Sequence, residues 1–181
     1  MSHKEQEEFC KKILKKHPDF FYNVNVLDCG SLDINGNNRY LFKESRYCGV
    51  DVGSGRNVDV VSPIHLLEGM DEEYDIIIST ECFEHDQYYD LSLKKIATML
   101  KPGGAFLFTC ATTGRPEHGT RRSKPHDAPL LEGSWSDYYK NLTEKDIRLS
   151  IPVDEVFEYY FFETSTSGPK DLRFFGIKKN I

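Results

Sequence analysis

The segment Val24–Ser31 constrains the fold more than any other part of the chain, because its apolar residues end directly at an acid and a glycine. The apolar residues around Val26 predict a buried parallel strand. Gly30 allows a close backbone approach after this strand, and Gly36 allows a positive φ in the polar turn that follows. A strand that ends in such a turn is typical of a site for a nucleotide-like ligand.

A second acid supports this interpretation. Another apolar strand ends at Asp51, which follows Asp28 by 23 residues. In dinucleotide-binding units, a carboxylate at about this spacing commonly accepts hydrogen bonds from the ribose hydroxyls. The glycine-containing turn and the spacing of the two acids therefore predict a nucleotide site whose ribose lies at Asp51.

The next part of the chain adds a specific order of elements. A third buried strand, residues 74–80, leads directly into Glu81–His85. A predicted helix over residues 91–100 ends in the sequence Leu-Lys-Pro-Gly-Gly, and a strand over residues 105–109 follows. From about residue 24 to residue 113, this ordered set resembles the class I S-adenosylmethionine (SAM)-dependent methyltransferase family.

The resemblance implies an α/β fold with a Rossmann-like, mostly parallel sheet, helices on both faces and an antiparallel hairpin at the C-terminal end. In this family the loop after the first strand lies against the methionine part of SAM, and the acid after the second strand binds the ribose. At the matching positions, the resemblance implies SAM contacts from Asp28, Gly30, Ser31, Asn35, Gly36, Asp51, Val52, Ile64, His65, Thr80, Glu81 and Phe83.

The chain departs from the family pattern at three places. The family loop carries further glycines where this chain has Leu32 and Ile34, and Gly36 comes late, as if the loop were two residues longer. Between Asp51 and the expected strand at residues 58–61, the connection is too short for the helix of a parallel crossover. We therefore expect a sheet that is reduced around its second and third strands. Residues 62–65 read Ser-Pro-Ile-His where the family often has an acid for the adenine amino group, so an apolar sandwich around the adenine is expected.

Composition agrees with one domain over residues 1–181. The chain is 39% hydrophobic and 29% charged, and no Pro/Gly/Ser-rich linker divides it. It has no apolar run long enough to span a membrane and no secretory h-region near its start, so no membrane span is expected. A formal charge of −6 argues against nucleic acid as the main partner, because phosphate binding favours a basic face.

The five cysteines indicate a reducing compartment. Their odd number, their wide spacing and the absence of a C-x-x-C motif argue against disulfides and zinc. Several lie in or beside predicted strands, where free cysteine acts as a small buried hydrophobe. A cytoplasmic location is the expectation.

The remaining elements flank this α/β body. An amphipathic helix is predicted within residues 1–20, and a short helix is predicted over Leu142–Ser150. Aromatic-rich strands at residues 156–162 and 172–177 form the expected hairpin, with its turn at Ser167–Pro169.

Residues 111–136 form a long polar segment with little periodicity, which predicts a lid on the acceptor side. Methyl transfer needs no covalent nucleophile, but an alcohol acceptor needs a base. His118 in the lid is the first candidate for this base, and the alternative is His85, after the third buried strand. The structural alternatives are that His118 is an exposed loop histidine and that His85 only packs against or orients its own loop. The carboxylates near these histidines could form a magnesium site, but their spacing does not require one. No metal is therefore expected. These carboxylates are Glu81, Glu84, Asp86 and Glu117.

Acceptor contacts are expected from a charged and aromatic set in and just after the lid: Arg115, Glu117, Trp135, Tyr138 and Tyr139. Arginines there suit either an acceptor phosphate or a solvated loop, and the aromatic faces suit a sugar, a base or ordinary packing. The first hypothesis is O-methylation of a sugar hydroxyl on a small-molecule or glycan acceptor. Methylation of a protein or metabolite amine and a non-catalytic SAM-fold binding or scaffold module stay open, whereas the Leu-Lys-Pro-Gly-Gly motif disfavours a nicotinamide oxidoreductase.

Overall fold

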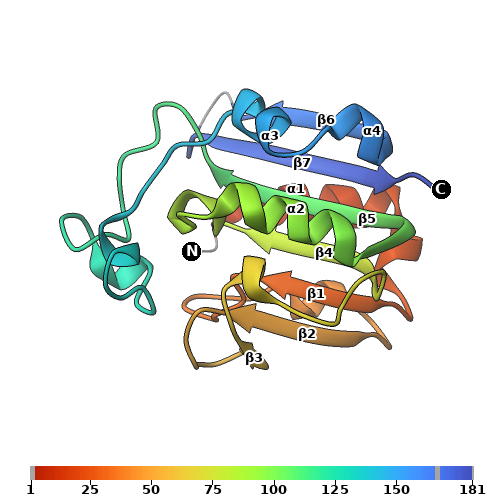
Figure 1. The fold of residues 1–181 in the computed structure, drawn as a ribbon, viewed down its shortest axis with the longest axis horizontal. Coiled ribbons are helices and arrows are strands. Elements are labelled where there is room, and N and C mark those ends of the chain that lie inside the picture. The colour runs from red at the N-terminus through yellow and green to blue at the C-terminus, as the bar shows by residue number, and fades with distance from the viewer. Residues whose placement is uncertain (1–2, 166–167, 181) are drawn as a thin grey trace.

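The structure is a computed structural model that describes residues 3–165 and 168–180. Its centre is a seven-stranded sheet in the order β3-β2-β1-β4-β5-β7-β6 (Figure 1). The strands from β1 to β5 pair in parallel, whereas β7 is antiparallel to both β5 and β6. This topology confirms the mostly parallel sheet with antiparallel C-terminal strands. The strands are β1 (Asn25–Cys29), β2 (Arg46–Asp51), β3 (Val60–Val61), β4 (Tyr74–Thr80), β5 (Leu100–Ala111), β6 (Phe157–Thr164) and β7 (Asp171–Lys178).

Helices cover both faces of the sheet. Helix α1 lies on one face, and the other three lie on the opposite face (Figure 1). The first helix begins after His3, whose ring Nδ1 accepts a hydrogen bond from the backbone N–H of Gln6 at 3.3 Å. The predicted turn at Ser167–Pro169 joins β6 and β7, and its first residue lies outside the described residues. The helices are α1 (Lys4–Lys16), α2 (Tyr89–Met99), α3 (Glu144–Ser150) and α4 (Val153–Val156).

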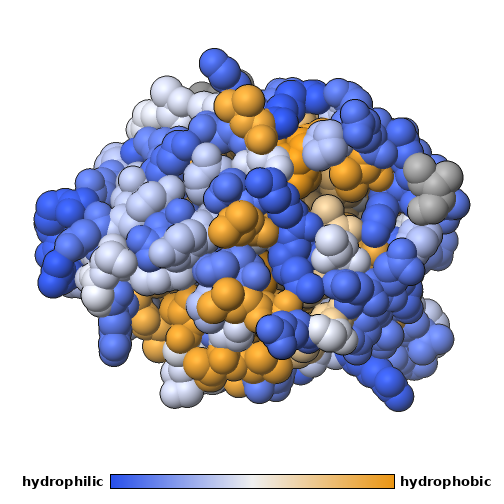
Figure 2. Space-filling model, in the orientation of Figure 1, coloured by the Kyte–Doolittle hydropathy of each residue, from blue (hydrophilic) through white to orange (hydrophobic). Residues whose placement is uncertain are grey.

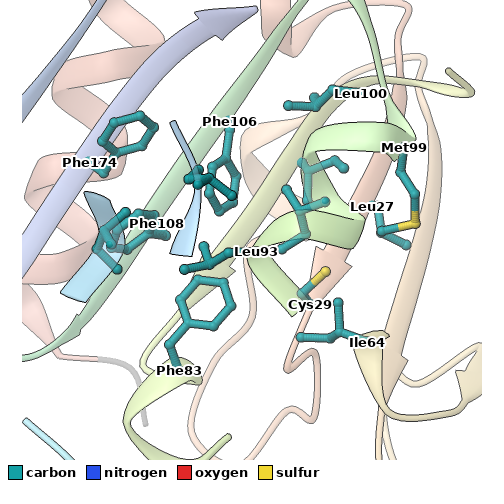
Figure 3. Packing of buried hydrophobic residues seen from close by; sticks show 14 of the residues in the cluster. Leu27, Cys29, Ile64, Phe83, Leu93, Met99, Leu100, Phe106, Phe108 and Phe174 are labelled. Atoms are coloured by element: carbon teal, nitrogen blue, oxygen red, sulfur yellow. The ribbon is translucent and has the colours of Figure 1, made fainter. Parts of the chain in front are cut away.

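Two apolar cores sandwich the sheet. Neighbouring residues on one strand enter opposite cores: Leu27 and Phe174 join the core that includes α2 and α3, whereas Val26 and Phe175 join the core that includes α1. Figure 3 shows the first of these cores, in which the ring of Phe106 lies between strands and helix. Because both faces are buried, the central strands read as continuous apolar runs, which is why the sequence revealed them.

Strand β5 is longer than the strand predicted at residues 105–109. It begins at Leu100, because Leu100 pairs with Tyr74 of β4 ahead of a shift in register. Helix α2 correspondingly ends at Met99 and begins at Tyr89, two residues before the predicted start. The Lys178 ammonium of β7 donates to the backbone oxygen of Leu100 at 2.8 Å, so both neighbouring strands fix this early start.

The connections around β2 are reduced on both sides. Residues 52–59 carry no helix, as the short connection predicted, and residues 30–45 carry only a single 3₁₀ turn at Arg39–Leu41. Asp33 organises this polar loop, because its carboxylate accepts from the backbone N–H of Gly36 at 2.8 Å and from the Asn37 amide at 2.9 Å. The missing helix before β2 was not predicted.

Residues 112–140, defined here as the excursion, leave the sheet after β5 and form the lobe that projects to one side in Figure 1. Its surface is mostly hydrophilic in Figure 2. Both ends are tied: the N–H of Leu142 donates to the carbonyl of Ala111, and the N–H of Lys140 donates to the carbonyl of Glu84, each at 2.9 Å. No helix in the described part of the chain is long and apolar enough to cross a membrane.

Candidate functional site

A cavity of about 730 Å³ opens at the carboxyl ends of β1 and β4, where open α/β sheets bind ligands. The loop after β1 forms one wall and Glu81 forms another, while residues 127–131 of the excursion line it from outside the sheet. Gly30 turns the chain at the floor with a φ of 78°, which is the left-handed region that glycine favours.

A second cavity of about 350 Å³ adjoins the first. Its lining is mainly apolar and includes Val50, Ile64 and Leu131. Five residues line both cavities, so the two are parts of one elongated space: Gly30, Asp51, Cys82, His85 and Leu131. An elongated ligand with one polar and one flat apolar end fits such a space.

Asp51 lies where the two cavities join. Its Oδ2 accepts the backbone N–H of Leu32 at 3.0 Å, and its Oδ1 accepts the N–H of Val52 at 2.8 Å. Burial raises the pKa of this carboxyl, although both backbone hydrogen bonds oppose the shift. The predicted ribose acid therefore also anchors the loop that follows β1.

A buried polar network supports the floor of the first cavity. Tyr47 donates its hydroxyl proton to Asp28, and the Asn38 amide lies 3.4 Å from the second Asp28 oxygen. Asn38 also donates to the Thr80 hydroxyl at 3.0 Å, and Gln6 of α1 donates to the Asn38 oxygen at 3.5 Å. Burial raises the pKa of Asp28 to about 6, and the hydrogen bonds from Tyr47 and Asn38 limit that rise.

A cluster of opposite charges lies beside Glu81, at the end of β4. Glu81 has a φ of 55°, a conformation that is uncommon for residues other than glycine and often marks a functional site. Its carboxylate accepts from Thr109 at 2.9 Å and from the Arg115 guanidinium at 3.3 Å. The Arg115 guanidinium also pairs with Asp171 at 2.5 Å, and the His3 ring lies 3.3 Å from the same acid. Burial favours a higher pKa for Glu81, but His3 and Arg115 outweigh it and lower the pKa to about 2.

Glu84, His85 and His118 form a second cluster, called here the EHH cluster. All three are buried, and their donor atoms lie within 4.8 Å of one another. The Nε2 of His118 is 3.9 Å from the Glu84 carboxylate, and the two imidazole rings meet edge to face at 5.0 Å. Tyr139 packs on both rings, at 5.6 Å from His85 and 5.1 Å from His118.

The EHH cluster is short of hydrogen-bond partners. Among the described residues, neither Glu84 oxygen and neither ring nitrogen of His85 has one. Burial, followed by the charge of Glu81, raises the pKa of Glu84 to about 8. Burial, followed by the nearby His118, lowers the pKa of His85 to about 3. Burial also lowers the pKa of His118. At neutral pH both imidazoles are therefore uncharged, and each ring has one nitrogen that carries a lone pair.

The residues for which the sequence predicted SAM contacts lie in different parts of the structure. Val52 and Ile64 line the second cavity, and His65 stands beside it, with its ring 6.5 Å from that of Trp135. Phe83 lines neither cavity, because it is fully buried in the core against Phe106 and Phe108, so its expected contact is corrected. The first cavity is lined by Asp28, Gly30, Ser31, Asn35, Gly36, Asp51, Thr80 and Glu81.

The residues expected to contact an acceptor are also dispersed. Trp135 lines the second, apolar cavity, and Arg115 is held in the Glu81 cluster. Glu117 pairs with Arg122 at the surface, while Tyr138 is half-buried and lines neither cavity. Of this set, Tyr139 alone packs on the EHH cluster.

Sequence reasoning missed Gln6, Asn38 and the stretch 127–131 as parts of the first cavity. Gln6 carried a signal, since a glutamine on the apolar face of an amphipathic helix is unusual and it is 1% exposed. The other two depend on long-range packing, which residue patterns do not reveal.

A family model described as a methyltransferase domain matches residues 1–140. The chain belongs to this family and is a SAM-dependent methyltransferase with the class I fold. No curated protein matches the sequence.

Solved structures share the fold at low sequence identity. The Burkholderia thailandensis 1,6-didemethyltoxoflavin-N1-methyltransferase, bound to its substrate and S-adenosylhomocysteine, is 17% identical, with a TM-score of 0.64 over 94% of this chain and 76% of its own. The Haemonchus contortus phosphoethanolamine N-methyltransferase 2, in complex with SAM, is 17% identical, with a TM-score of 0.65. That match covers 96% of this chain but only 53% of the Haemonchus enzyme.

Proposed function

We propose that the protein transfers the methyl group of SAM to a hydroxyl of a small polar acceptor, with a neutral sugar as the first candidate. The observation that carries this proposal is the EHH cluster, whose unpartnered nitrogens and oxygens lie next to the joined cavities. A hydroxyl needs such groups, because it has to lose its proton as the new bond to carbon forms.

The joined cavities support a SAM position in which the methionine part occupies the first and the adenine the second. The ribose then lies at Asp51, which lines both. Adenine packs among Ile64, Leu131 and Trp135, in agreement with the expected apolar sandwich. Asp28, whose hydrogen-bond partners are the uncharged Tyr47 and Asn38, gives the methionine end a carboxylate that suits the ammonium group of SAM. Glu81 lines the same cavity but is already paired with Arg115.

The reaction is an in-line displacement. The acceptor oxygen attacks the methyl carbon, the bond from carbon to sulfur breaks, and S-adenosylhomocysteine leaves as a neutral thioether. His85 lines both cavities and is the histidine nearest to the donor space, whereas His118 lies behind it at a ring distance of 5.0 Å. In the metal-free protein, His118 is the base, as predicted from the sequence, and His85, whose pKa burial lowers to about 3, lies between it and the donor space.

The charges of the excursion favour a neutral acceptor over a phosphorylated one. Arg121 and Arg122 both pair with Asp137, and Arg115 is held by Glu81 and Asp171. Guanidinium groups that already have carboxylate partners are poorly placed to bind an acceptor phosphate. A cytoplasmic location is part of the proposal, because all five cysteines are free thiols, which a reducing compartment maintains.

Incubation with radiolabelled methyl-SAM tests the function. Neutral mono- and oligosaccharides, amines and proteins are offered as acceptors in parallel, and calorimetry measures SAM binding in the same preparation. Label in a saccharide that resists mild acid and base, as an ether does, is the expected result. Label in amines or proteins alone would replace the sugar acceptor, although the enzyme class would stand.

A further inference from the structure

The EHH cluster places a buried carboxyl group beside two histidines, and removing a proton from the acceptor does not require that carboxyl group. Glu84 is fully buried, and both its oxygens lack a hydrogen-bond partner among the described residues. The gap of 3.9 Å from Glu84 to the Nε2 of His118 is too long for a hydrogen bond. A buried carboxyl group without a partner is costly, so an occupant that binds it is expected.

His118 is oriented as a metal-binding histidine is. Its Nδ1 lies 3.1 Å from the carbonyl oxygen of Pro116. That contact fixes the proton on Nδ1 and leaves the Nε2 lone pair directed at Glu84. Tyr139, whose hydroxyl is 3.3 Å from the same carbonyl oxygen, closes the outer side of the ring.

We propose that Glu84, His85 and His118 bind one divalent transition-metal ion and that the open coordination positions take the acceptor oxygen. Two imidazole nitrogens and one carboxylate are a common ligand set for zinc and iron(II) ions in proteins that keep a position free for substrate. With metal–ligand bonds of about 2 Å, two donor atoms of a tetrahedral ion lie about 3.3 Å apart, so the 3.9 Å pair of Glu84 and His118 needs a side-chain shift of about 0.6 Å.

The ligand atoms of the EHH cluster suit a transition-metal ion better than magnesium. Magnesium prefers oxygen ligands and water, whereas two of the three donors here are ring nitrogens. The expectation that magnesium is not needed is therefore compatible with this site, which selects a softer cation.

The other candidate group in the described residues does not qualify. His3, Glu81 and Asp171 also place three donor atoms close together. However, the Arg115 guanidinium pairs with both acids, at 3.3 and 2.5 Å, and supplies the positive charge that a cation would bring. Among the described side chains, no lysine or arginine pairs with Glu84, and Arg115 acts on it only at longer range.

This inference rests on the proposed function and deepens it. In the loaded protein the two histidines are ligands, and the cation takes over the task of the base by lowering the pKa of the bound hydroxyl. The hydroxyl proton passes to water, the oxygen forms its bond to the methyl carbon, and the bond from carbon to sulfur breaks. The acceptor class then narrows to molecules that present a hydroxyl able to bind a metal ion.

Calorimetry of the chelator-treated protein with zinc chloride tests the site directly, and cobalt(II) chloride adds a visible absorption band as a second readout. We expect one equivalent to bind, and we expect the affinity to fall by at least about tenfold in both His118→Asn and Glu84→Gln. The matched control is His126→Asn, which removes an exposed histidine from the same excursion and keeps every cysteine. Thermal melting checks that each variant is folded.

Each outcome decides the question. Equal zinc stoichiometry and affinity in wild type and His118→Asn, or no binding to the folded wild type, would overturn the metal site. Saccharide methylation that persists in chelated protein would leave the proposed function standing without the metal. Zinc binding at the cluster with no methylation of any hydroxyl acceptor would instead keep the site and reject the proposed function.

Discussion

Gly30 and Cys82 approach so closely that a Cβ placed on Gly30 would lie 2.6 Å from both the Cβ and the Sγ of Cys82. This contact joins the loop after β1 to the segment after β4, and both residues line both cavities. Only glycine satisfies the contact and the φ of 78° together.

Replacement of Gly30 by alanine should therefore damage fold and cofactor site together. Positive φ and overpacking should lower the free energy of unfolding by about 2–4 kcal/mol. SAM affinity should fall at least about tenfold, because the floor of the cavity has to move. Gly69→Ala is the matched control: its φ is 69°, but nothing lies within 4 Å of the added Cβ, so only the smaller backbone cost should appear in urea unfolding. Equal losses in the two variants would contradict the packing argument.

Asp51→Asn should weaken SAM binding by about 2–3 kcal/mol, a roughly 30- to 150-fold rise in Kd, because a charge-assisted contact to the ribose is lost. Asp51→Ala should lower stability as well, since the backbone N–H groups of Leu32 and Val52 then lose their acceptor. Calorimetry and thermal melting on the same samples separate the two effects. An unchanged Kd in folded Asp51→Asn would remove the ribose from this position.

The raised pKa of Asp28 predicts how stability changes with pH. Its folded-state pKa is about 6, above its ordinary value of 3.8, so between these values the unfolded chain releases a proton that the folded protein retains. The wild type should thus lose about 3 kcal/mol relative to Asp28→Asn as the pH rises from about 3 to about 7, and the difference should stay constant above that range. Urea unfolding of both proteins across this range, without SAM, measures it. A difference that does not vary with pH would show that Asp28 titrates normally.

The excursion should contribute to SAM binding through Leu131, which lines both cavities. Leu131→Ala should weaken SAM binding by about 1–2 kcal/mol through lost apolar contact. Leu149→Ala is the control, because that side chain is 77% exposed and remote from the cavities. Calorimetry should show no change in the control, and equal SAM affinity in all three proteins would mean that the excursion does not cover the cofactor.

Substitutions of the two histidines of the EHH cluster should have different effects on turnover and on SAM affinity. His118→Ala should lower turnover by about 10²–10⁴ with SAM affinity within a small factor, because His118 lines neither cavity. His85→Ala should change both turnover and SAM affinity, because it lines both. Steady-state kinetics with the saccharide acceptor and calorimetry with SAM provide the comparison. Near wild-type turnover in His118→Ala would leave His85 as the group that acts.

Local patterns were sufficient for the central strands and for the place of Asp51 at the end of β2, because buried parallel strands are continuous apolar runs. They failed for Phe83, which the family pattern placed at SAM but which fills the core against Phe108. They gave no path for residues 112–140, since the path of a long irregular segment depends on contacts such as that of Leu130 with Gly53. The EHH cluster joins residues 33 positions apart, so the sequence offered its histidines only as alternatives to each other.

The tied ends of the excursion have a consequence for how such enzymes diversify. Ala111 and Leu142 are joined by a backbone hydrogen bond of 2.9 Å. The segment between them therefore begins and ends at the same place on the sheet, and it can be replaced without moving the strands. Exchanging this segment between relatives should change which acceptor binds while the register of the strands stays the same. The exchange has two constraints, since the incoming segment must still bring a leucine to the two joined cavities and a histidine towards Glu84.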